Sequence, residues 1–407
     1  MLVLLRTALT SPARHPRTAV VLGRLLGLGF LVCFGTGLFS HLLQDPLPGM
    51  AFPTGPVWLY RLTQGVHVAV GTALIPLLLA KLWTVYPLLF RWPPVRTVAG
   101  LLERAAIALL VAAALVQLAT GLADTYQWYP WPFRFRQTHF ALAWALVGTL
   151  AIHIGVKLPV IARWWRRSRS VAADGALLPV AEGEGDLRPE PAARGLTGML
   201  QRRLLRAPEP PPAVSRRTVL VATGVASAAV VGLTAGETLP ALAPINVFAP
   251  RRLRYGPQGL PVNRTAAEGG VQRTALDPAW RLEVRGPERS VALTLDDLRA
   301  MPQTDAGLPI ACVEGWSTQA RWRGVPVRDL ADLVGARDRE LVVRSFARGA
   351  YSATVLQREF AEDPLTLVAL ELNGEVLHVD HGYPARLISP ARPGVLQTKW
   401  LRSLEVR

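Results

Sequence analysis

Residues 309–317 read PIACVEGWS, and this stretch decides how the C-terminal part of the chain is expected to fold. It sets one cysteine, Cys312, between an apolar run and a Gly-Trp pair. The chain has two cysteines, and the other, Cys33, lies in a distant apolar span, so no internal disulfide framework is predicted. A free thiol outside the cytoplasm is exposed to oxidation unless it is buried or bound to a metal. Cys312 is therefore either a buried structural cysteine or a metal ligand.

The residues around this stretch alternate between apolar and polar positions, as half-buried strands do. The predicted strands include residues 280–284, 341–345 and 365–370. Helical or turn segments are predicted at residues 294–301 and 327–334. The C-terminal part is accordingly predicted to be a mixed α+β domain.

Further motifs follow in order along the chain. Residues 322–330 read WRGVPVRDL, residues 373–375 read NGE, residues 380–387 read DHGYPARL and residues 397–401 read QTKWL. Together with PIACVEGWS, they make about residues 255–407 resemble the sulfite oxidase superfamily of molybdopterin enzymes. The resemblance implies that the Cys312 thiolate coordinates molybdenum and is the catalytic ligand. A soft, anionic sulfur suits a high-valent oxo-metal that cycles by two electrons.

The same resemblance implies which residues bind the molybdopterin. His381 and Arg386 are expected to contact the pterin or its phosphate, and the turn of Gln397, Thr398 and Lys399 is expected to wrap the cofactor. Asn263, in the sequence PVNR, is similar to the asparagine that begins the family's cofactor segment. A guanidinium fork and clustered N–H groups hold a phosphate well. Taken singly, Arg386 would be read as a surface ion pair and Lys399 as a solvated charge, but the ordered motifs favour cofactor binding.

The chain departs from the superfamily in two respects. It stops at Arg407, directly after the Lys-Trp step, so the dimerisation domain of sulfite oxidases is expected to be absent. The basic residues that hold sulfite in that family have no clear match here. The expected substrate is therefore a small-molecule oxygen-atom donor or acceptor, and the family does not specify which one.

The first half of the chain is predicted to be a membrane domain. A helix needs about 20 apolar residues to cross a bilayer, and five candidates are found, at residues 20–43, 57–86, 100–123, 139–161 and 218–239. The net charge is +16, but the arginines cluster beside these spans, so they are interpreted as topology signals and no nucleic-acid partner is predicted. The predicted architecture is a membrane α-helical bundle of four helices at 1–165, a cytoplasmic linker at 166–213, a fifth anchor helix at 214–244 and the α+β molybdopterin domain at 245–407.

Basic residues predict the orientation of the spans. They flank one end of each of the first four spans. Before the first span stand Arg6, Arg14 and Arg17; between the second and third stand Lys81, Arg91, Arg96 and Arg104; at the end of the fourth stand Arg163, Arg166, Arg167 and Arg169. These ends should face the cytoplasm. The opposite loops, 44–56 and 124–137, carry little positive charge, and the second contains Trp128, Tyr129 and Trp131. The N-terminus is predicted to be cytoplasmic, and five spans would place residues 245–407 outside the cytoplasm, at the plasma membrane.

The segment before the fifth span has two features. Residues 199–206 form a short basic amphipathic stretch, interpreted either as lying on the inner leaflet or as a solvated turn. Residues 215–220 read SRRTVL and precede a mildly apolar span, which resembles an internal twin-arginine export signal. Such signals serve proteins that fold around a cofactor before export. An ordinary anchor with a positive cytoplasmic flank is the alternative.

Four of the seven histidines lie in or at the ends of the spans, namely His41, His67, His139 and His153. An ionisable side chain in lipid is costly and usually functional, and haem b iron is commonly held by two imidazoles. His139 and His153 lie 14 residues apart on one predicted helix, which is about 21 Å along the axis and nearly a whole number of turns. The alternative is that the histidines make hydrogen bonds inside the bundle. His41 lies at the lipid interface, where a histidine is unremarkable.

The bundle resembles the cytochrome b subunits of formate dehydrogenase and hydrogenase, a bacterial cytochrome b561-like family. Residues 67–71, HVAVG, are similar to that family's His-x-x-x-Gly. The resemblance implies that His67 and His139 ligate an outer haem b, with His153 as a candidate for an inner one. Gly23 and Arg24 stand where the family has the first-helix histidine of the inner haem, so one haem is expected.

Two functions are consistent with these patterns. The first is a membrane-bound molybdopterin-dependent oxidoreductase that transfers an oxygen atom outside the cytoplasm and exchanges electrons through haem b with quinone or quinol in the lipid. The second is a haem-binding membrane redox carrier or sensor, whose outer domain binds a partner without molybdenum chemistry. Molybdenum analysis of the purified protein separates them.

Overall fold

The computed structural model describes residues 12–90, 97–166, 170, 178, 214–234, 242–349 and 352–407. The chain divides into two compact units. We call residues 1–34, 70–124 and 128–231 the helical unit, and residues 35–69, 125–127 and 232–407 the sheet unit. Several sequence predictions lie outside the described residues: the stretch 199–206 and most of the linker, the end of the fifth span at 235–239, and Arg6, Arg91, Arg96, Arg167 and Arg169.

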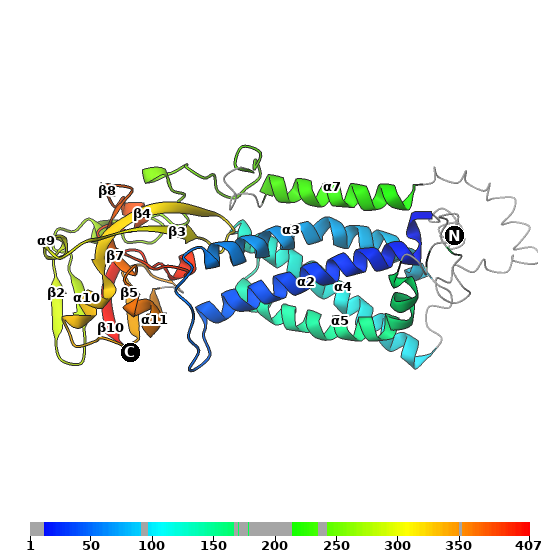
Figure 1. Ribbon diagram of the computed structural model, residues 1–407, viewed down its shortest axis with the longest axis horizontal. Coiled ribbons are helices and arrows are strands. Elements are labelled where there is room, and N and C mark those ends of the chain that lie inside the picture. The colour runs from blue at the N-terminus through cyan, green and yellow to red at the C-terminus, as the bar shows by residue number, and fades with distance from the viewer. Residues whose placement is uncertain are drawn as a thin grey trace, which may run out of the picture. The chain divides into compact units, whose positions relative to one another are not determined.

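Five described helices are long and apolar enough to cross a membrane (Figure 1). They are α2 (Pro16–Gln44), α3 (Leu59–Val85), α4 (Val98–Thr125), α5 (Phe135–Trp165) and α7 (Arg216–Thr234). Short 3₁₀ turns, η1 (Pro12–Arg14) and η2 (Tyr86–Phe90), precede α2 and follow α3. Large apolar side chains are exposed on these helices, for example Leu28 at 63% and Leu31 at 65%. Such a surface suits lipid rather than water, and each predicted span corresponds to one of these helices.

Contacts inside the helical unit join neighbouring helices. Gly29 of α2 lies under Leu74 of α3, where an added Cβ would come within 2.6 Å of a leucine methyl carbon. The ring of Phe34 meets Trp144 of α5 edge-on at 5.0 Å. Lys157 of α5 pairs with Glu103 of α4, and Ser227 of α7 donates to the Ala73 carbonyl at 3.0 Å. Small residues and polar side chains at such contacts are typical of helices packed in membranes.

The sheet unit holds two five-stranded sheets. The strand order in one sheet is β2 (Ser290–Leu293), β1 (Leu282–Arg285), β10 (Leu401–Val406), β5 (Leu341–Ser345) and β6 (Ala353–Leu356). The strand order in the other sheet is β3 (Thr304–Ala311), β4 (Ser317–Pro326), β7 (Leu367–Leu372) and β8 (Glu375–Val376). β9 (Arg386–Ile388) also pairs with β7. β1 and β10 are parallel, so the C-terminal strand returns beside the first one.

Short helices complete the α+β domain: α8 (Gln272–Ala275), α9 (Leu295–Ala300), α10 (Val327–Asp332), α11 (Arg358–Glu362), η6 (Pro257–Gly259), η7 (Val379–His381) and η8 (Gly394–Leu396). Thr294 begins α9 with a reciprocal capping box to Asp297. The main core is shared by both sheets and includes Leu282, Val343 and Leu387, all fully buried. The predicted mixed architecture is confirmed.

The predicted strands match the structure with small shifts. β5 covers the predicted residues, whereas β1 and β7 each begin two residues later than predicted. The reason for β7 is a turn, because the backbone N–H groups of Leu365 and Thr366 bond to Asp363 rather than to a neighbouring strand. Trp280 lies before β1, and its indole N–H donates to the Leu401 carbonyl at 3.0 Å.

Candidate active site

Cys312 lies in the turn between β3 and β4, and we call residues 312–316 the Cys312 loop. β3 and β4 pair up to Ala311 and Ser317, and the Cys312 N–H then donates to the Trp316 carbonyl at 2.9 Å. Gly315, at φ +91°, makes the sharp turn and donates to the Cys312 carbonyl at 3.1 Å. The hairpin therefore fixes the backbone of the cysteine on both sides.

The environment of the thiol opposes its ionisation. Cys312 is 3% exposed, and burial, followed by the nearby Glu314 carboxylate, raises the pKa of its thiol. A bound metal cation reverses this balance, because a coordinating thiol is deprotonated outright. The site thus fits a thiolate only when a positive centre is present. Among the described residues, no group of three His, Cys, Asp or Glu side chains could hold a metal ion.

Glu314 is a site residue that the sequence analysis did not single out. Its side chain is 1% exposed, accepts from the Trp316 indole at 2.9 Å and pairs with the Nε of Arg251 at 3.3 Å. Gln127 also donates to the same carboxylate. A buried carboxylate next to Cys312 is thus paired with Arg251, which lies 63 residues away in sequence. No local pattern could have predicted that pairing.

Arg386 is buried at the start of β9. Its guanidinium donates to the carbonyls of His381 at 3.0 Å and Gln397 at 3.1 Å, and lies 5.0 Å from the centre of the Trp322 ring. The Nε atom has no hydrogen-bond partner among the described residues. Burial lowers the pKa of Arg386 to about 9. A buried cation that still has an unused donor is suited to an anionic ligand.

Lys399 reaches the same region. Its Nζ donates to the carbonyls of Arg264 and Asp380, each at 2.8 Å. Burial, and then the nearby Arg386, lowers the pKa of Lys399 to about 7. Gly382, at φ +111°, lies between the two cations, since an added Cβ would come within 3.0 Å of Arg386 Cβ and 3.2 Å of Lys399 Cβ. The structure therefore brings these two predicted residues together.

The other predicted cofactor residues take several positions. His381 is buried, and its Nε2 lies 2.8 Å from the Pro257 carbonyl. Burial lowers its pKa to about 4, so the imidazole is neutral at pH 7. The Gln397 side chain bonds to the backbone of Ser389 at 2.8 and 2.7 Å, and Thr398 bonds to Thr354 at 3.0 Å, so both side chains hold the protein's own loops. Asn263 is half-buried, next to the Arg264 carbonyl that Lys399 contacts.

Arg392 is a second buried arginine, and the sequence analysis did not single it out. It is 2% exposed, donates to the Leu396 carbonyl at 3.1 Å and to the Val355 carbonyl, and leaves its Nε without a partner among the described residues. Burial lowers its pKa to about 9. No described salt bridge joins Arg386, Arg392 or Lys399 to a carboxylate. Glu359 acts on Arg392 and Asp380 on Lys399 through charge alone, without a described salt bridge. Buried basic groups without salt bridges fit an anionic cofactor.

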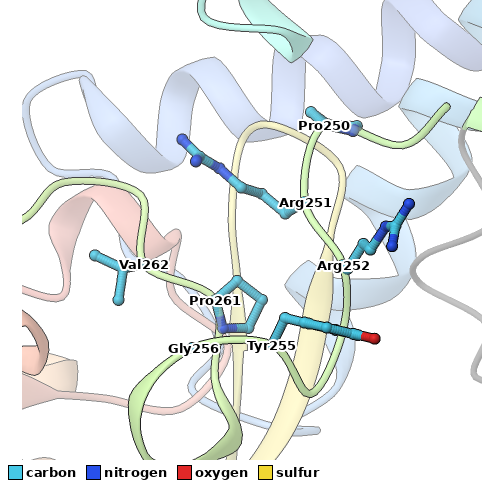
Figure 2. Close-up of a pocket in the computed structure, with 7 residues that line it drawn as sticks. All are labelled: Pro250, Arg251, Arg252, Tyr255, Gly256, Pro261 and Val262. Atoms are coloured by element: carbon cyan, nitrogen blue, oxygen red, sulfur yellow. The ribbon is translucent and has the colours of Figure 1, made fainter.

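A cavity of about 360 Å³ lies beside the segment that carries Arg251. It is lined by Pro250, Arg251, Arg252, Tyr255, Gly256, Pro261 and Val262 (Figure 2). Figure 2 shows the guanidinium groups of Arg251 and Arg252 extending to different sides of this segment. Since Arg251 also pairs with Glu314, one side chain joins the cavity wall to the Cys312 loop.

Residues 268–407 match a family model described as the oxidoreductase molybdopterin binding domain. The C-terminal domain is a molybdopterin-binding oxidoreductase domain. The match starts within the predicted 255–407 region and includes Cys312, His381, Arg386 and Lys399. The prediction of a molybdopterin-dependent oxidoreductase is confirmed for this domain, whereas the individual roles of the site residues stay predictions.

The chain is also similar to curated proteins over part of its length. It is 36% identical, over 130 residues, to a protein named as the protein-methionine-sulfoxide reductase subunit YedZ1 of Azospira oryzae, covering 31% of this chain and 49% of that protein. It is 32% identical, over 162 residues, to mitochondrial sulfite oxidase of Rattus norvegicus, covering 32% of this chain and 30% of that protein. The chain thus spans half or less of the length of these relatives. Among solved structures, the sulfane dehydrogenase SoxCD of Paracoccus pantotrophus matches with a TM-score of 0.29 and 24% identity, covering 32% of this chain and 38% of that one.

Two predicted haem ligands have closely similar surroundings. In the sheet unit, Nδ1 of His67 lies 3.1 Å from the Thr36 hydroxyl, and Gly37 faces the ring, where an added Cβ would be 2.9 Å from Cε1. In the helical unit, Nδ1 of His139 lies 3.1 Å from the Thr120 hydroxyl, and Gly121 faces the ring, with an added Cβ 3.1 Å from Cε1. A hydrogen bond at one ring nitrogen orients an imidazole for metal binding through the other.

The other two histidines of the predicted spans are His153 and His41. His153 of α5 is half-buried, and its Nδ1 has no hydrogen-bond partner among the described residues. His41 lies in the last turn of α2 and is half-buried. The Thr and Gly contacts are described for His67 and His139, the two residues predicted to ligate the outer haem.

Proposed function

We propose that the chain is a membrane-bound oxidoreductase whose molybdenum, ligated by Cys312, transfers an oxygen atom outside the cytoplasm. The observation that carries this proposal is the presence, in one domain, of a fixed, buried cysteine and of buried basic side chains that make no described salt bridge. When bound, molybdopterin supplies the two-electron oxygen-atom chemistry. The protein's residues would anchor the metal and hold the anionic part of the cofactor.

The roles of the cofactor residues follow from their surroundings. Arg386 and Lys399 would hold the phosphate, because both are buried basic groups that flank Gly382, and a bound anion would favour the protonated form of Lys399. His381 is neutral at pH 7 and its Nε2 is hydrogen-bonded to Pro257, so it would act as a positioned hydrogen-bonding group rather than as a charge. Gln397 and Thr398 would shape the turn that brings Lys399 to the cofactor, since their own side chains bond to other loops.

We further propose one haem b on His67 and His139, which exchanges electrons with membrane quinone or quinol. The two rings share the same threonine hydrogen bond and glycine contact, which a bis-imidazole site would explain. His153 is the candidate for a second haem, and it lacks this pattern.

The orientation proposed from the sequence keeps the N-terminus in the cytoplasm and residues 245–407 outside. The start of α7 supports a signal role for its arginine pair. Ser215 caps this helix by accepting from the Thr218 N–H at 3.1 Å, which places Arg216 and Arg217 in the first turn. Positive charges there oppose the helix dipole and do not stabilise the helix. A topology or twin-arginine export signal accounts for their presence.

The experiment that tests this function combines turnover and spectroscopy. Purified protein is supplied with a quinol and a sulfoxide, or with sulfite and a quinone, because the relatives' names include methionine sulfoxide and sulfite. Cys312→Ala is expected to lose turnover in the active direction and to keep the haem absorption spectrum of the wild type. Full activity in this variant would rule out Cys312 as the molybdenum ligand.

A further inference from the structure

The Cys312 loop lies against helix α3, within the sheet unit. The Nε2 of Gln64 donates a hydrogen bond of 2.9 Å to the carbonyl of Val313, the residue that follows Cys312. One turn further along the helix, Val68 meets Gly315, where an added Cβ would come within 2.9 Å of a valine methyl carbon. Two side chains of one helix face thus touch the loop that carries the metal ligand.

The orientation of Gln64 is fixed by its other partners. Its amide oxygen accepts from the Tyr60 hydroxyl at 3.4 Å, and that hydroxyl lies 3.0 Å from the Ser40 hydroxyl of α2. Tyr60 is 1% exposed and Gln64 is 7% exposed. Because the oxygen is engaged by Tyr60, the amide nitrogen points toward Val313. The contact is therefore a built hydrogen-bond chain from α2 through α3 to the Cys312 loop.

The same turn of α3 carries His67. Gln64 and His67 are three residues apart, which is about 4.5 Å along a helix axis, and residues at this spacing lie on one face. Thr36 and Gly37 of α2 hold the His67 ring, while Ser40, one turn further along α2, belongs to the Gln64 chain. One short stretch of two packed helices thus holds the proposed haem ligand and contacts the proposed molybdenum-ligand loop.

We propose that residues 60–68 of α3 are the electron bridge between the haem and the molybdenum site, and that Gln64 is its positioning residue. This inference rests on the proposed function. One electron crosses at a time and two cross for each oxygen atom transferred, with quinone accepting both or quinol supplying both. Gln64 holds the Val313 carbonyl, in the peptide between Val313 and Glu314, from the same helix turn that carries His67, and a rigid contact favours electron transfer because the rate falls steeply with distance.

The first test measures the positioning role without cofactors. Full-length chain carrying Cys33→Ser is produced without molybdenum, so that Cys312 is its only thiol, and alkylation by iodoacetamide is timed. Gln64→Ala leaves the Val313 carbonyl without its donor, and the loop is expected to open and alkylate about tenfold faster. Thr63→Ala is the matched control, because the hydrogen bonds that Thr63 donates to described residues stay within α3, at the carbonyls of Leu59 and Tyr60. Its alkylation rate should equal that of the parent.

The second test uses the fully loaded protein. After rapid mixing with the oxygen-atom donor or acceptor, the haem band of Gln64→Ala should change about tenfold or more slowly than that of the wild type. Turnover with a soluble electron partner that reacts directly at the molybdenum site is measured in parallel, and the haem rate should fall by a clearly larger factor than this turnover. Thr63→Ala should resemble the wild type in both assays. Unchanged alkylation in Gln64→Ala overturns its positioning role, and unchanged haem kinetics overturn the bridge. A wild-type protein without haem overturns the proposed function itself, and its absorption spectrum reveals that before any variant is made.

Discussion

Gly394 packs directly against the backbone of Cys312. A Cβ added to Gly394 would lie 2.8 Å from the Ala311 carbonyl oxygen and 3.4 Å from the Cα of Cys312. The turn at the start of η8 is therefore in van der Waals contact with the end of β3, and it helps to fix the position of the cysteine. The glycine is required here by close approach, not by a positive φ.

The contact predicts the effect of Gly394→Ala. The new methyl must push either the turn or the Cys312 backbone aside, since the atom that it meets is backbone. The overpacked site should lose about 1–3 kcal/mol of stability and most of its turnover. Gly307→Ala is the control. Gly307 lies in β3, the strand that ends at Ala311, and a Cβ added there would lie at an ordinary contact distance of 3.6 Å from the Gln319 side chain. Equal turnover in the two variants would show that the contact does not position Cys312.

Arg386→Met should separate cofactor binding from folding. The substitution leaves the carbonyls of His381 and Gln397 without a donor, at about 1–3 kcal/mol each. It also removes a buried charge, whose desolvation opposes folding in the absence of an anion. The two effects largely offset each other, so the free energy of unfolding of the cofactor-free chain should change by less than about 2 kcal/mol. Molybdenum content should fall at least about tenfold. Normal molybdenum content would show that Arg386 does not hold the cofactor.

Lys399 should make the stability of the cofactor-free chain depend on pH. Its pKa is about 7 in the folded protein and about 10.4 when unfolded. Between these values the unfolded chain binds more protons at this site than the folded chain does. The free energy of unfolding should therefore rise from pH 7 toward pH 10, and the site destabilises the fold most below pH 7. Lys399→Met removes this contribution, so denaturant titrations at pH 6, 7.5 and 9 should give a smaller rise in the variant. A wild-type minus variant difference that is constant with pH would contradict the lowered pKa.

The sequence predicted the helices and strands better than it predicted the surroundings of the candidate site residues. Long apolar runs and strand alternation are local patterns, so the five helices and β5 lie where they were predicted. Cys312 and Arg386 were found through ordered motifs. Glu314, Arg251 and Arg392 were not singled out, because their roles depend on burial and on partners far away in the chain, such as the 63 residues between Arg251 and Glu314. The start of β7 was predicted too early because the turn at Asp363 depends on side-chain hydrogen bonding that apolarity does not reveal.

The haem ligands can be tested by substitution. His67→Ala and His139→Ala should each abolish the bis-imidazole absorption bands and uncouple quinone chemistry from the molybdenum site. Activity with a soluble electron partner should be spared, because the proposed molybdenum ligand, Cys312, is a separate residue. A pyridine haemochrome assay should give one haem per chain in the wild type and almost none in either variant. Two haems per chain, or full haem content in a variant, would show this ligand assignment to be wrong.

The most direct test of the central claim is molybdenum K-edge X-ray absorption on the wild type and on Cys312→Ser, with the metal content of each sample measured in parallel. We predict close to one molybdenum per chain in the wild type, and the loss of one sulfur ligand from the metal in the variant. Absence of molybdenum from a wild-type protein that contains haem, or an unchanged sulfur count in the variant, would contradict the assignment of Cys312 as the molybdenum ligand.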